Sequence, residues 1–310
     1  QRLFHHDGER AVAKAAQKYG TMFGVSALGT VSVEEIGEVI PDTPKMFQFY
    51  FHKDRGLNDS MIDRAKAAKF DVMALTVDTI TGGNRERDHR TGFTSPPKLT
   101  PASLMSFALR PRWTWNYLTH PKFDLPHLST HVQEGSNIAT SIGSYFAKML
   151  DQSMNWKDAE KIRERWGGHF ALKGVMSVAD ARRAVDIGCT GIMVSNHGAR
   201  QLDIAPSPLE VPPAINEAVG DKMTVMFDGG IRRGMDAIVA LCMGAKFCFV
   251  GRPTLYGVAA GGVPGATKAL PIFRREIDLT QAQIGAPKIS DLGPQFLMWK
   301  DVEDLRRNKR

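Results

Sequence analysis

Cysteine is scarce in this sequence, and its scarcity argues against two common ways of stabilising a fold. The 310 residues include only Cys189, Cys242 and Cys248, which lie in apolar stretches without the spacing of a zinc site. An odd and small number of cysteines provides no disulfide framework, which indicates a reducing compartment. We therefore expect buried thiols, no metal site and a cytoplasmic location.

Long apolar runs are missing as well. No stretch approaches the ~20 apolar residues of a membrane-spanning helix, and no signal peptide is visible. The formal net charge is +7, with basic residues around positions 110–122 and at 306–310, but no nucleic-acid-binding motif accompanies them. We expect an anionic substrate and an anionic cofactor, and no nucleic acid as a partner.

Short apolar runs alternate with helix-like segments along the chain. This alternation predicts parallel βα units, and nearly continuous apolar runs suit strands that are buried on both faces. Ser32 with Glu35, and Ser177 with Asp180, have the spacing of helix N-terminal caps. The seven predicted strands are Met22–Ala27, Met46–Phe51, Val72–Val77, Phe170–Leu172, Gly191–Ser195, Thr224–Phe227 and Phe247–Val250.

Seven strands are one fewer than the eight that close a (β/α)8 barrel. The chain also begins on a helix, led by Asp7, Gly8 and Glu9. We predict an α/β fold, a TIM-type (β/α)8 barrel that lacks its first strand in this chain, with residues 1–310 forming a single domain. An open seven-stranded sheet is the alternative.

One long interruption breaks the alternation, from about residue 82 to residue 159. It shows no clear strand, holds three of the five tryptophans, and has five of the seventeen prolines between Pro96 and Pro121. A loop of this length in a compact domain is usually functional or mobile. Its aromatic side chains interleave with Arg110 and Arg112, a composition that suits a membrane interface. Packing on the chain's own barrel or on a neighbouring subunit is the alternative.

The most specific motif is SNHGARQLD, residues 195–203, which directly follows a predicted strand. Because the carboxyl ends of barrel strands carry the active site, His197 and Arg200 would face the same mouth. An imidazole accepts a proton near neutral pH, and a guanidinium binds a carboxylate through two N–H groups. The alternative is a solvated surface histidine and arginine, which the whole motif disfavours.

A carboxylate and a second arginine follow another apolar run, in ALTVDT (residues 74–79) and the loop after it. Asp78 could hold and orient the protonated ring of His197, and Arg85 could provide a second carboxylate clamp. Tyr50 shares a strand face with Gln48 and could hydrogen-bond a substrate. The alternatives are a helix cap for Asp78, a loop salt bridge for Arg85 and a core position for Tyr50.

Two further features suit an anionic cofactor. Lys173 ends a predicted strand and is costly to bury without an anion, such as a flavin ring that gains negative charge on reduction. A lysine that reaches solvent is the alternative. DGGIRRG (228–234) and GRP (251–253) follow the last two strands, where barrels commonly bind phosphate through backbone N–H groups.

These motifs resemble those of the FMN-dependent 2-hydroxy acid dehydrogenases and oxidases, a family that includes L-lactate dehydrogenase, mandelate dehydrogenase and glycolate oxidase. SNHGARQLD, LTVDT, LKG, DGGIRRG and VGRPTLYG occur in the family's order and spacing, and the resemblance runs from Asp7 to about Leu297. The family fold is an FMN-binding (β/α)8 barrel. Its first strand, one flavin contact and a second substrate tyrosine lack a counterpart here, so we expect this chain to be N-terminally truncated and to fold poorly or bind FMN weakly.

The resemblance implies that FMN oxidises a small L-2-hydroxy acid, with L-lactate to pyruvate as the first expectation. It implies catalytic roles for His197, Asp78 and Tyr50. Arg200, Arg85 and Tyr50 would bind the substrate. The implied FMN contacts are Ser26, Gln48 and Thr76 at the ring, Lys173 at its pyrimidine edge, and Asp228, Gly230, Arg232, Gly251 and Arg252 at the ribityl phosphate.

The substrate and the electron acceptor are less constrained. Leu28, near the family's side-chain pocket, favours lactate, whereas QAQIGAPKISDL (281–292) resembles the ending of mandelate dehydrogenase. An oxidase that reduces O2 and a non-catalytic remnant are alternatives. Flavin-dependent isomerisation is disfavoured because it would not need the acid-binding set. His197 could take either the hydroxyl proton or the α-proton of the substrate.

The long segment bears on the partners. Membrane-associated dehydrogenases of the family carry a segment at this place and pass electrons to quinone or cytochrome. The expected partners are therefore a 2-hydroxy acid, a quinone or cytochrome acceptor, the inner face of the plasma membrane and further copies of this chain.

Overall fold

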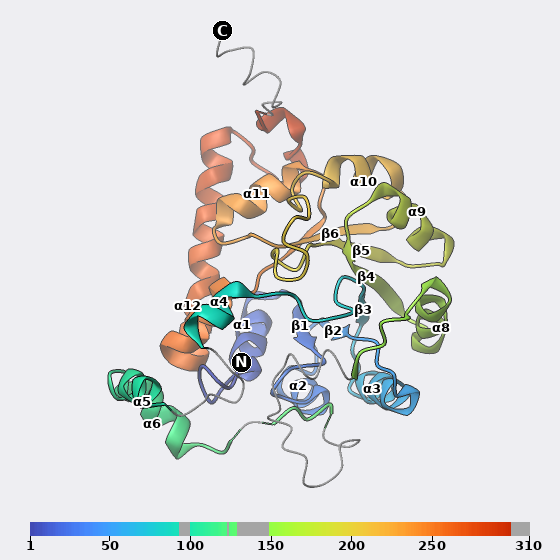
Figure 1. Cartoon of the computed structure of the whole chain (residues 1–310). Helices are drawn as coiled ribbons and strands as arrows, with labels where there is room; N and C mark the ends of the chain where they lie inside the picture. Colours follow the sequence, from blue (N-terminus) through green and yellow to red (C-terminus); the bar gives the residue numbers. More distant parts are fainter. Residues whose placement is uncertain (93–99, 123, 129–148, 299–310) are drawn as a thin grey trace.

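The computed structural model describes residues 1–92, 100–122, 124–128 and 149–298 of the chain. Its seven parallel strands form one sheet in which each strand pairs with the next along the sequence (Figure 1). Helices cover the outside of the strands, which is the arrangement of a TIM-type barrel. The predicted seven-strand barrel is confirmed, and β1 and β7 are not hydrogen-bonded to each other within the described part. The strands are β1 (Phe23–Ser26), β2 (Lys45–Phe49), β3 (Val72–Thr76), β4 (His169–Val175), β5 (Gly191–Val194), β6 (Thr224–Asp228) and β7 (Phe247–Phe249).

The helices begin where the sequence offers a cap. Ser32 Oγ accepts a hydrogen bond from Glu35 N at 3.2 Å, and Ser177 Oγ accepts one from Asp180 N at 3.1 Å, as their spacing predicts. The helices that cover the strands are α1 (Glu9–Tyr19), α2 (Val33–Val39), α3 (Arg55–Ala67), α8 (Trp156–Trp166), α9 (Val178–Asp186), α10 (Pro212–Val219), α11 (Gly234–Cys242) and α12 (Arg252–Ile284). Two short 3-10 helices, η2 (Ile289–Asp291) and η3 (Pro294–Phe296), follow.

The core is divided into layers by the alternation of side chains along each strand. Met46 and Ala74 belong to a small cluster of their own. The neighbouring residues Phe47 and Leu75 belong to the large cluster that includes side chains of the covering helices. Phe249 packs against the small cluster, which therefore continues to the last strand.

Short helices occupy the described parts of the predicted interruption at 82–159, and no strand is present in those parts. They are α4 (Glu86–Thr91), α5 (Pro101–Ala108) and α6 (Pro111–Thr119), of which α5 and α6 project from the barrel (Figure 1). Residues 93–99, 123 and 129–148 of this segment lie outside the described residues. Trp113 Nε1 donates to Leu3 O at 2.9 Å, and the rings of His6 and His120 stack at 3.7 Å. One side of α6 therefore packs on the chain itself. No described helix has both the length and the apolar character needed to cross a membrane.

Two buried histidines give the fold a predicted sensitivity to acid. Burial lowers the pKa of both His52 and His127 to about 4 from an ordinary 6.5. His127 Nε2 accepts a hydrogen bond from Val33 N at 3.1 Å, at the start of α2, and protonation removes this acceptor. The folded state holds both rings neutral, so their contribution to stability is complete above pH 6.5 and is lost as the pH falls towards 4.

We expect the free energy of unfolding to fall by roughly 2–3 kcal/mol per histidine between pH 7 and pH 4.5, at about 1.4 kcal/mol per pKa unit. Urea unfolding followed by circular dichroism at the two pH values measures this loss. The His127→Gln variant keeps an acceptor for Val33 N but does not titrate. Its free energy of unfolding should therefore fall by about half as much between the two pH values as that of the parent protein. An equal loss in both proteins would contradict the assignment.

Candidate active site

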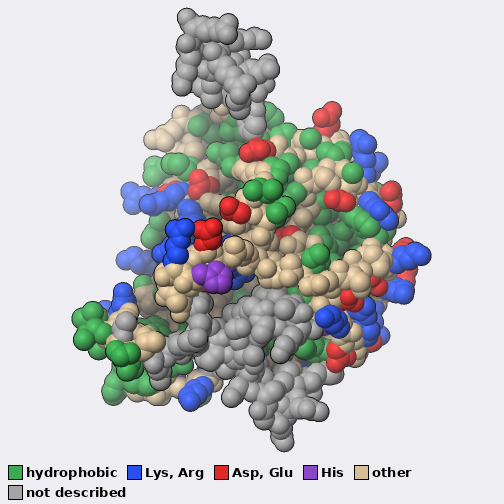
Figure 2. Space-filling model, in the orientation of Figure 1, with side chains coloured by type: hydrophobic (Ala, Val, Ile, Leu, Met, Phe, Trp, Pro, Cys, Tyr) green, Lys and Arg blue, Asp and Glu red, His purple; other side chains and the backbone are tan. Residues whose placement is uncertain are grey.

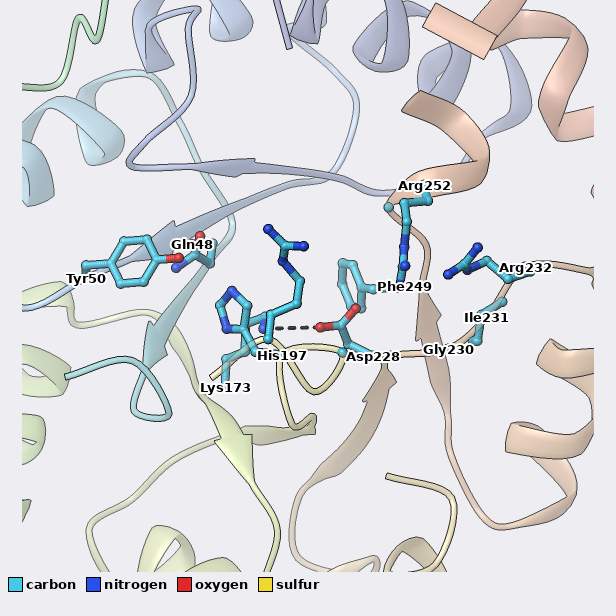
Figure 3. Close-up of a pocket in the computed structure, with 14 residues that line it drawn as sticks. Gln48, Tyr50, Lys173, His197, Asp228, Gly230, Ile231, Arg232, Phe249 and Arg252 are labelled. Atoms are coloured by element: carbon cyan, nitrogen blue, oxygen red, sulfur yellow. Dashed lines mark ion pairs between the residues drawn. The ribbon is translucent and has the colours of Figure 1, made fainter. Parts of the chain in front are cut away.

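A cavity of about 280 Å³ opens at the carboxyl end of the barrel (Figure 3). Its walls come from the ends of β2, β4, β6 and β7 and from the loops that follow β2, β5, β6 and β7. This is the end at which barrels place their chemistry. The lining residues are Gln48, Tyr50, Lys173, His197, Gly198, Arg200, Asp228, Gly229, Gly230, Ile231, Arg232, Phe249, Gly251 and Arg252.

Four residues predicted from the sequence do not line this cavity: Ser26, Thr76, Asp78 and Arg85. Thr76 lies behind Gln48 and accepts a hydrogen bond from its side-chain amide. Ser26 Oγ accepts from Leu28 N at 3.1 Å. Asp78 and Arg85 contact residues of the 195–203 loop. The other predicted site residues are all part of the cavity wall.

The lining also includes residues that sequence reasoning did not select as site residues. These are Gly198, Gly229, Ile231 and Phe249. The glycines and Ile231 lie inside motifs that were recognised, but their contact with the cavity depends on the loop conformation. Phe249 lies on the predicted strand Phe247–Val250. Alternation along a strand does not say which of its two faces points into the barrel, so the sequence alone does not place the Phe249 side chain in the cavity.

His197 and Asp78 form a hydrogen-bonded pair at the mouth. His197 Nδ1 lies 3.1 Å from Asp78 Oδ1, and Thr79 Oγ1 lies within 3.2 Å of both atoms. Because an ionised carboxylate only accepts hydrogen bonds, Nδ1 carries the proton and Nε2 is the basic nitrogen. The pair has the arrangement of a base and the acid group that orients it.

Asp78 stays ionised despite its burial. Burial alone would raise the pKa of this carboxyl, but the hydrogen bond from His197 and the charge of Lys173 outweigh it and hold the pKa below its usual value. Asp78 Oδ2 is buried and has no hydrogen-bond partner among the described residues. A negative charge is therefore held behind the imidazole, where it stabilises a proton on the ring.

The loop after β5 holds His197 in a strained conformation. His197 has φ 58° and Ala199 has φ 56°, both in the left-handed region that glycine favours. Ser195 Oγ accepts from His197 N at 3.1 Å, and Asn196 Oδ1 accepts from Ala199 N at 3.1 Å. These bonds hold a turn that costs about 1–3 kcal/mol per strained residue, a cost that is typical of functional sites.

Gly174 makes room for the acid of this pair. Its φ is 107°, and the register between β4 and β5 shifts at this point, between Lys173 and Val175. A Cβ atom at position 174 would lie 2.6 Å from Asp78 Cβ and 2.7 Å from Asp78 Cγ. Only glycine therefore fits this position with Asp78 in place.

Lys173 is paired inside the cavity, and only 12% of its side chain is exposed. Its Nζ lies 3.1 Å from Asp228 Oδ2, the ion pair drawn in Figure 3, and 3.3 Å from Ser195 Oγ. Ser195 Oγ in turn donates to Asp228 Oδ2 at 3.0 Å. The predicted role of Asp228 at the phosphate stays a prediction. Its carboxylate balances the charge of Lys173 and can also accept hydrogen bonds from hydroxyl groups.

Two arginines gather at one end of the cavity. In Figure 3, Arg232 and Arg252 lie at the opposite end from Tyr50, with His197 and Asp228 between them. Both arginines are exposed, and neither forms an ion pair with any residue that the structure describes. The neighbouring loop glycines, Gly230 and Gly251, have open space where a Cβ would stand. This end of the cavity can bind a doubly charged anion.

Two more cations lie near the base. Arg200 lines the cavity, and burial together with the charge of Arg200 lowers the pKa of the half-buried Arg85 guanidinium. Arg85 Nε is buried without a hydrogen-bond partner among the described residues. The positive charges of Arg85 and Arg200 repel each other, and the Nε–H of Arg85 has no described acceptor. An anionic ligand would relieve the repulsion and supply an acceptor. Burial raises the pKa of Tyr50 well above its usual value, so its hydroxyl remains a hydrogen-bond donor.

Comparison with known proteins gives the class to which this fold and site belong. A model of the FMN-dependent dehydrogenases matches residues 1–299. An L-lactate oxidase of Nostoc sp. is 38% identical over 300 residues, which cover 96% of this chain and 76% of the relative. Glycolate oxidase 1 of Oryza sativa subsp. indica is 36% identical over 307 residues, which cover 99% and 77%. The crystal structure of a monotopic membrane protein, (S)-mandelate dehydrogenase, matches with a TM-score of 0.88 at 32% identity and covers 96% of this chain and 78% of that one.

The chain belongs to the FMN-dependent dehydrogenase family. It is an FMN-dependent oxidoreductase of 2-hydroxy acids, as its motifs predicted. The cavity fits this cofactor, because Arg232 and Arg252, which form no ion pair with a described residue, offer charge to a phosphate at one end. The Gln48 amide and the Lys173 ammonium, both in the cavity wall, offer donors to a polar ring.

Proposed function

We propose that this protein oxidises a small L-2-hydroxy acid, L-lactate to pyruvate in the first instance, and passes the electrons to a quinone or a cytochrome. The observation that carries the proposal is the His197–Asp78 pair at 3.1 Å, next to a cavity that Arg200 lines. A base and a carboxylate-binding group on one mouth suit a substrate that carries both a hydroxyl and a carboxylate. Leu28 and the L-lactate oxidase relative favour lactate.

Each polar side chain at the mouth has a proposed role. Arg200 and Arg85 bind the substrate carboxylate, and Tyr50 hydrogen-bonds the substrate. His197 takes a proton from the substrate at Nε2, and Asp78 stabilises the resulting imidazolium through Nδ1–H. Bound FMN supplies the acceptor for the two electrons that leave the substrate carbon.

The remaining residues are proposed to bind the cofactor. Gln48 contacts the ring directly and Thr76 supports Gln48, while Lys173 offers its charge at the pyrimidine edge. Arg232 and Arg252 neutralise the phosphate. The other proposed cofactor-binding residues are Ser26, Asp228, Gly230 and Gly251. Residues 1–310 are proposed to act as one barrel domain and to assemble with further copies of the chain.

Anaerobic flavin reduction tests the proposed reaction. The FMN-loaded protein is mixed with L-lactate, D-lactate, glycolate or L-mandelate without oxygen, and the flavin absorbance is followed. We expect bleaching by L-lactate, no bleaching by D-lactate, and slower bleaching by the other two. If none of the acids bleaches the flavin, the proposed function fails. Faster bleaching by L-mandelate would move the assignment to a mandelate dehydrogenase, a reading that the (S)-mandelate dehydrogenase match favours. Fast peroxide formation in air would indicate an oxidase.

We also propose that the outer side of α5 and α6 contacts a membrane surface, at the inner face of the plasma membrane. Figure 2 shows hydrophobic side chains gathered on this projecting part, at the lower left. The exposed apolar side chains are Leu104 (53%), Met105 (63%), Leu109 (73%), Trp115 (72%) and Leu118 (72%). Exposed basic residues, Arg110 and Arg112, lie among them. Apolar groups interleaved with basic ones are typical of interfacial helices.

Binding to anionic lipid vesicles tests the membrane contact. The double variant Leu109→Glu/Trp115→Glu should lower the vesicle-bound fraction by about tenfold or more, because it removes apolar contacts and adds negative charge. Ile272→Glu/Ile289→Glu is the matched control, since these side chains are 49% and 48% exposed elsewhere on the chain. Equal binding of both double variants and the parent protein would show that α5 and α6 do not face the lipid.

A further inference from the structure

Gln201 joins two loops that carry the arginines of the mouth. Its Nε2 donates to Thr81 O at 2.8 Å. Its Oε1 accepts from Gly83 N at 3.3 Å and from Arg85 Nη2 at 3.4 Å. The side-chain amide of Gln201 therefore forms hydrogen bonds with three groups of the loop after β3. In the sequence, Gln201 directly follows Arg200.

Gly83 brings the same two loops into backbone contact. A Cβ atom at position 83 would lie 2.1 Å from Arg200 O and 2.8 Å from Gln201 Cα. These partners are backbone atoms, so a side chain at 83 could be accommodated only if the loops moved apart. Gly83 has an ordinary φ, and its smallness serves this close approach rather than backbone freedom.

Arg85 needs such support because its surroundings disfavour its charge. Burial and the neighbouring Arg200 lower the pKa of its guanidinium. Among the described residues, Arg85 forms no ion pair, and the hydrogen bond to Gln201 is the one that its side chain makes. Without a tether, repulsion would drive the two cations apart whenever no substrate is bound.

We infer that Gln201, seated against Gly83, is a positioning residue that holds Arg85 beside Arg200 in the spacing that a substrate carboxylate requires. The inference rests on the proposed function, because it takes both arginines as carboxylate-binding groups. Gln201 does not touch the reacting atoms. A neutral amide suits this task, since a carboxylate in its place would occupy Arg85 and compete with the substrate.

Steady-state and binding measurements on FMN-loaded Gln201→Met test the inference. Methionine keeps the length of the side chain but removes all three hydrogen bonds. Because the substrate carboxylate keeps its charge throughout the reaction, loosening its clamp removes uniform binding. We expect KM for L-lactate and the dissociation constant of pyruvate, read from the flavin spectrum, to rise about tenfold, with kcat within about threefold of the parent. Gln283→Met, an exposed glutamine on α12, is the matched control and should leave both constants unchanged.

A second variant and a double-mutant cycle separate positioning from general destabilisation. Gly83→Ala should reproduce the rise in KM by forcing the two loops apart, without removing a polar side chain. In an Arg85→Met background, Gln201→Met should add less than about twofold, because the group that it positions is already gone. If Arg85→Met leaves KM unchanged, the proposed function is at fault. If Arg85→Met raises KM but Gln201→Met does not, or if the two effects multiply, the positioning role is overturned.

Discussion

Replacing His197 by glutamine is expected to lower the rate of flavin reduction by about 10²- to 10⁴-fold while FMN stays bound, since general base catalysis contributes on this scale. Glutamine can still donate a hydrogen bond to Asp78, which lies 3.1 Å from His197 Nδ1, but it cannot accept a proton near neutral pH. The loss should therefore appear in the chemical step rather than in the fold.

Stopped-flow reduction by L-lactate under anaerobic conditions measures this rate directly. The flavin absorbance and the unfolding temperature of His197→Gln should match those of the parent protein, which controls for cofactor loss. Near-normal reduction by this variant would remove His197 from the mechanism.

Replacing Asp78 by asparagine is expected to lower the same rate by about 10²- to 10⁴-fold, because an orienting carboxylate has an effect of this size on a catalytic histidine. The change removes the negative charge that lies behind the imidazole and leaves the Lys173 charge less compensated. An asparagine can also present its NH2 group to Nδ1, which favours the wrong tautomer of His197.

Stability and cofactor content distinguish this role from simple destabilisation. The unfolding temperature and the flavin absorbance of Asp78→Asn should match those of the parent protein, while its rate of flavin reduction falls. Asp203→Asn is the matched control, because Asp203 is an exposed carboxylate of the same loop. A reduced rate that is accompanied by a lower unfolding temperature and loss of bound flavin would argue that Asp78 supports only the fold.

Patterns within a single segment were predictable from the sequence. The seven strands were predictable because each is a short, nearly continuous apolar run, and the Ser32 and Ser177 caps because capping is local in sequence. His197, Arg200 and the glycine–arginine loops were found because they follow strands directly, and the barrel brings strand ends together.

Contacts between distant segments were not predictable in the same way. Lys173 and Asp228 belong to different strands, and nothing in either motif indicates that they form an ion pair with each other. The left-handed backbone of His197 and Ala199 gave no signal either, because neither residue is a glycine. Gln201 was visible inside a recognised motif, but its role depends on the loop that carries Gly83.

Gly174 limits which amino-acid substitutions this part of the barrel can accept. The space between β4 and the acid of the catalytic pair is filled by a hydrogen atom, so an added methyl group would press directly on Asp78. A substitution such as Gly174→Ala alters no charge and removes no hydrogen-bonding group, yet by displacing Asp78 it would lower the activity as strongly as loss of His197. The lack of space beside Asp78 and the φ of 107° therefore both restrict position 174 to glycine.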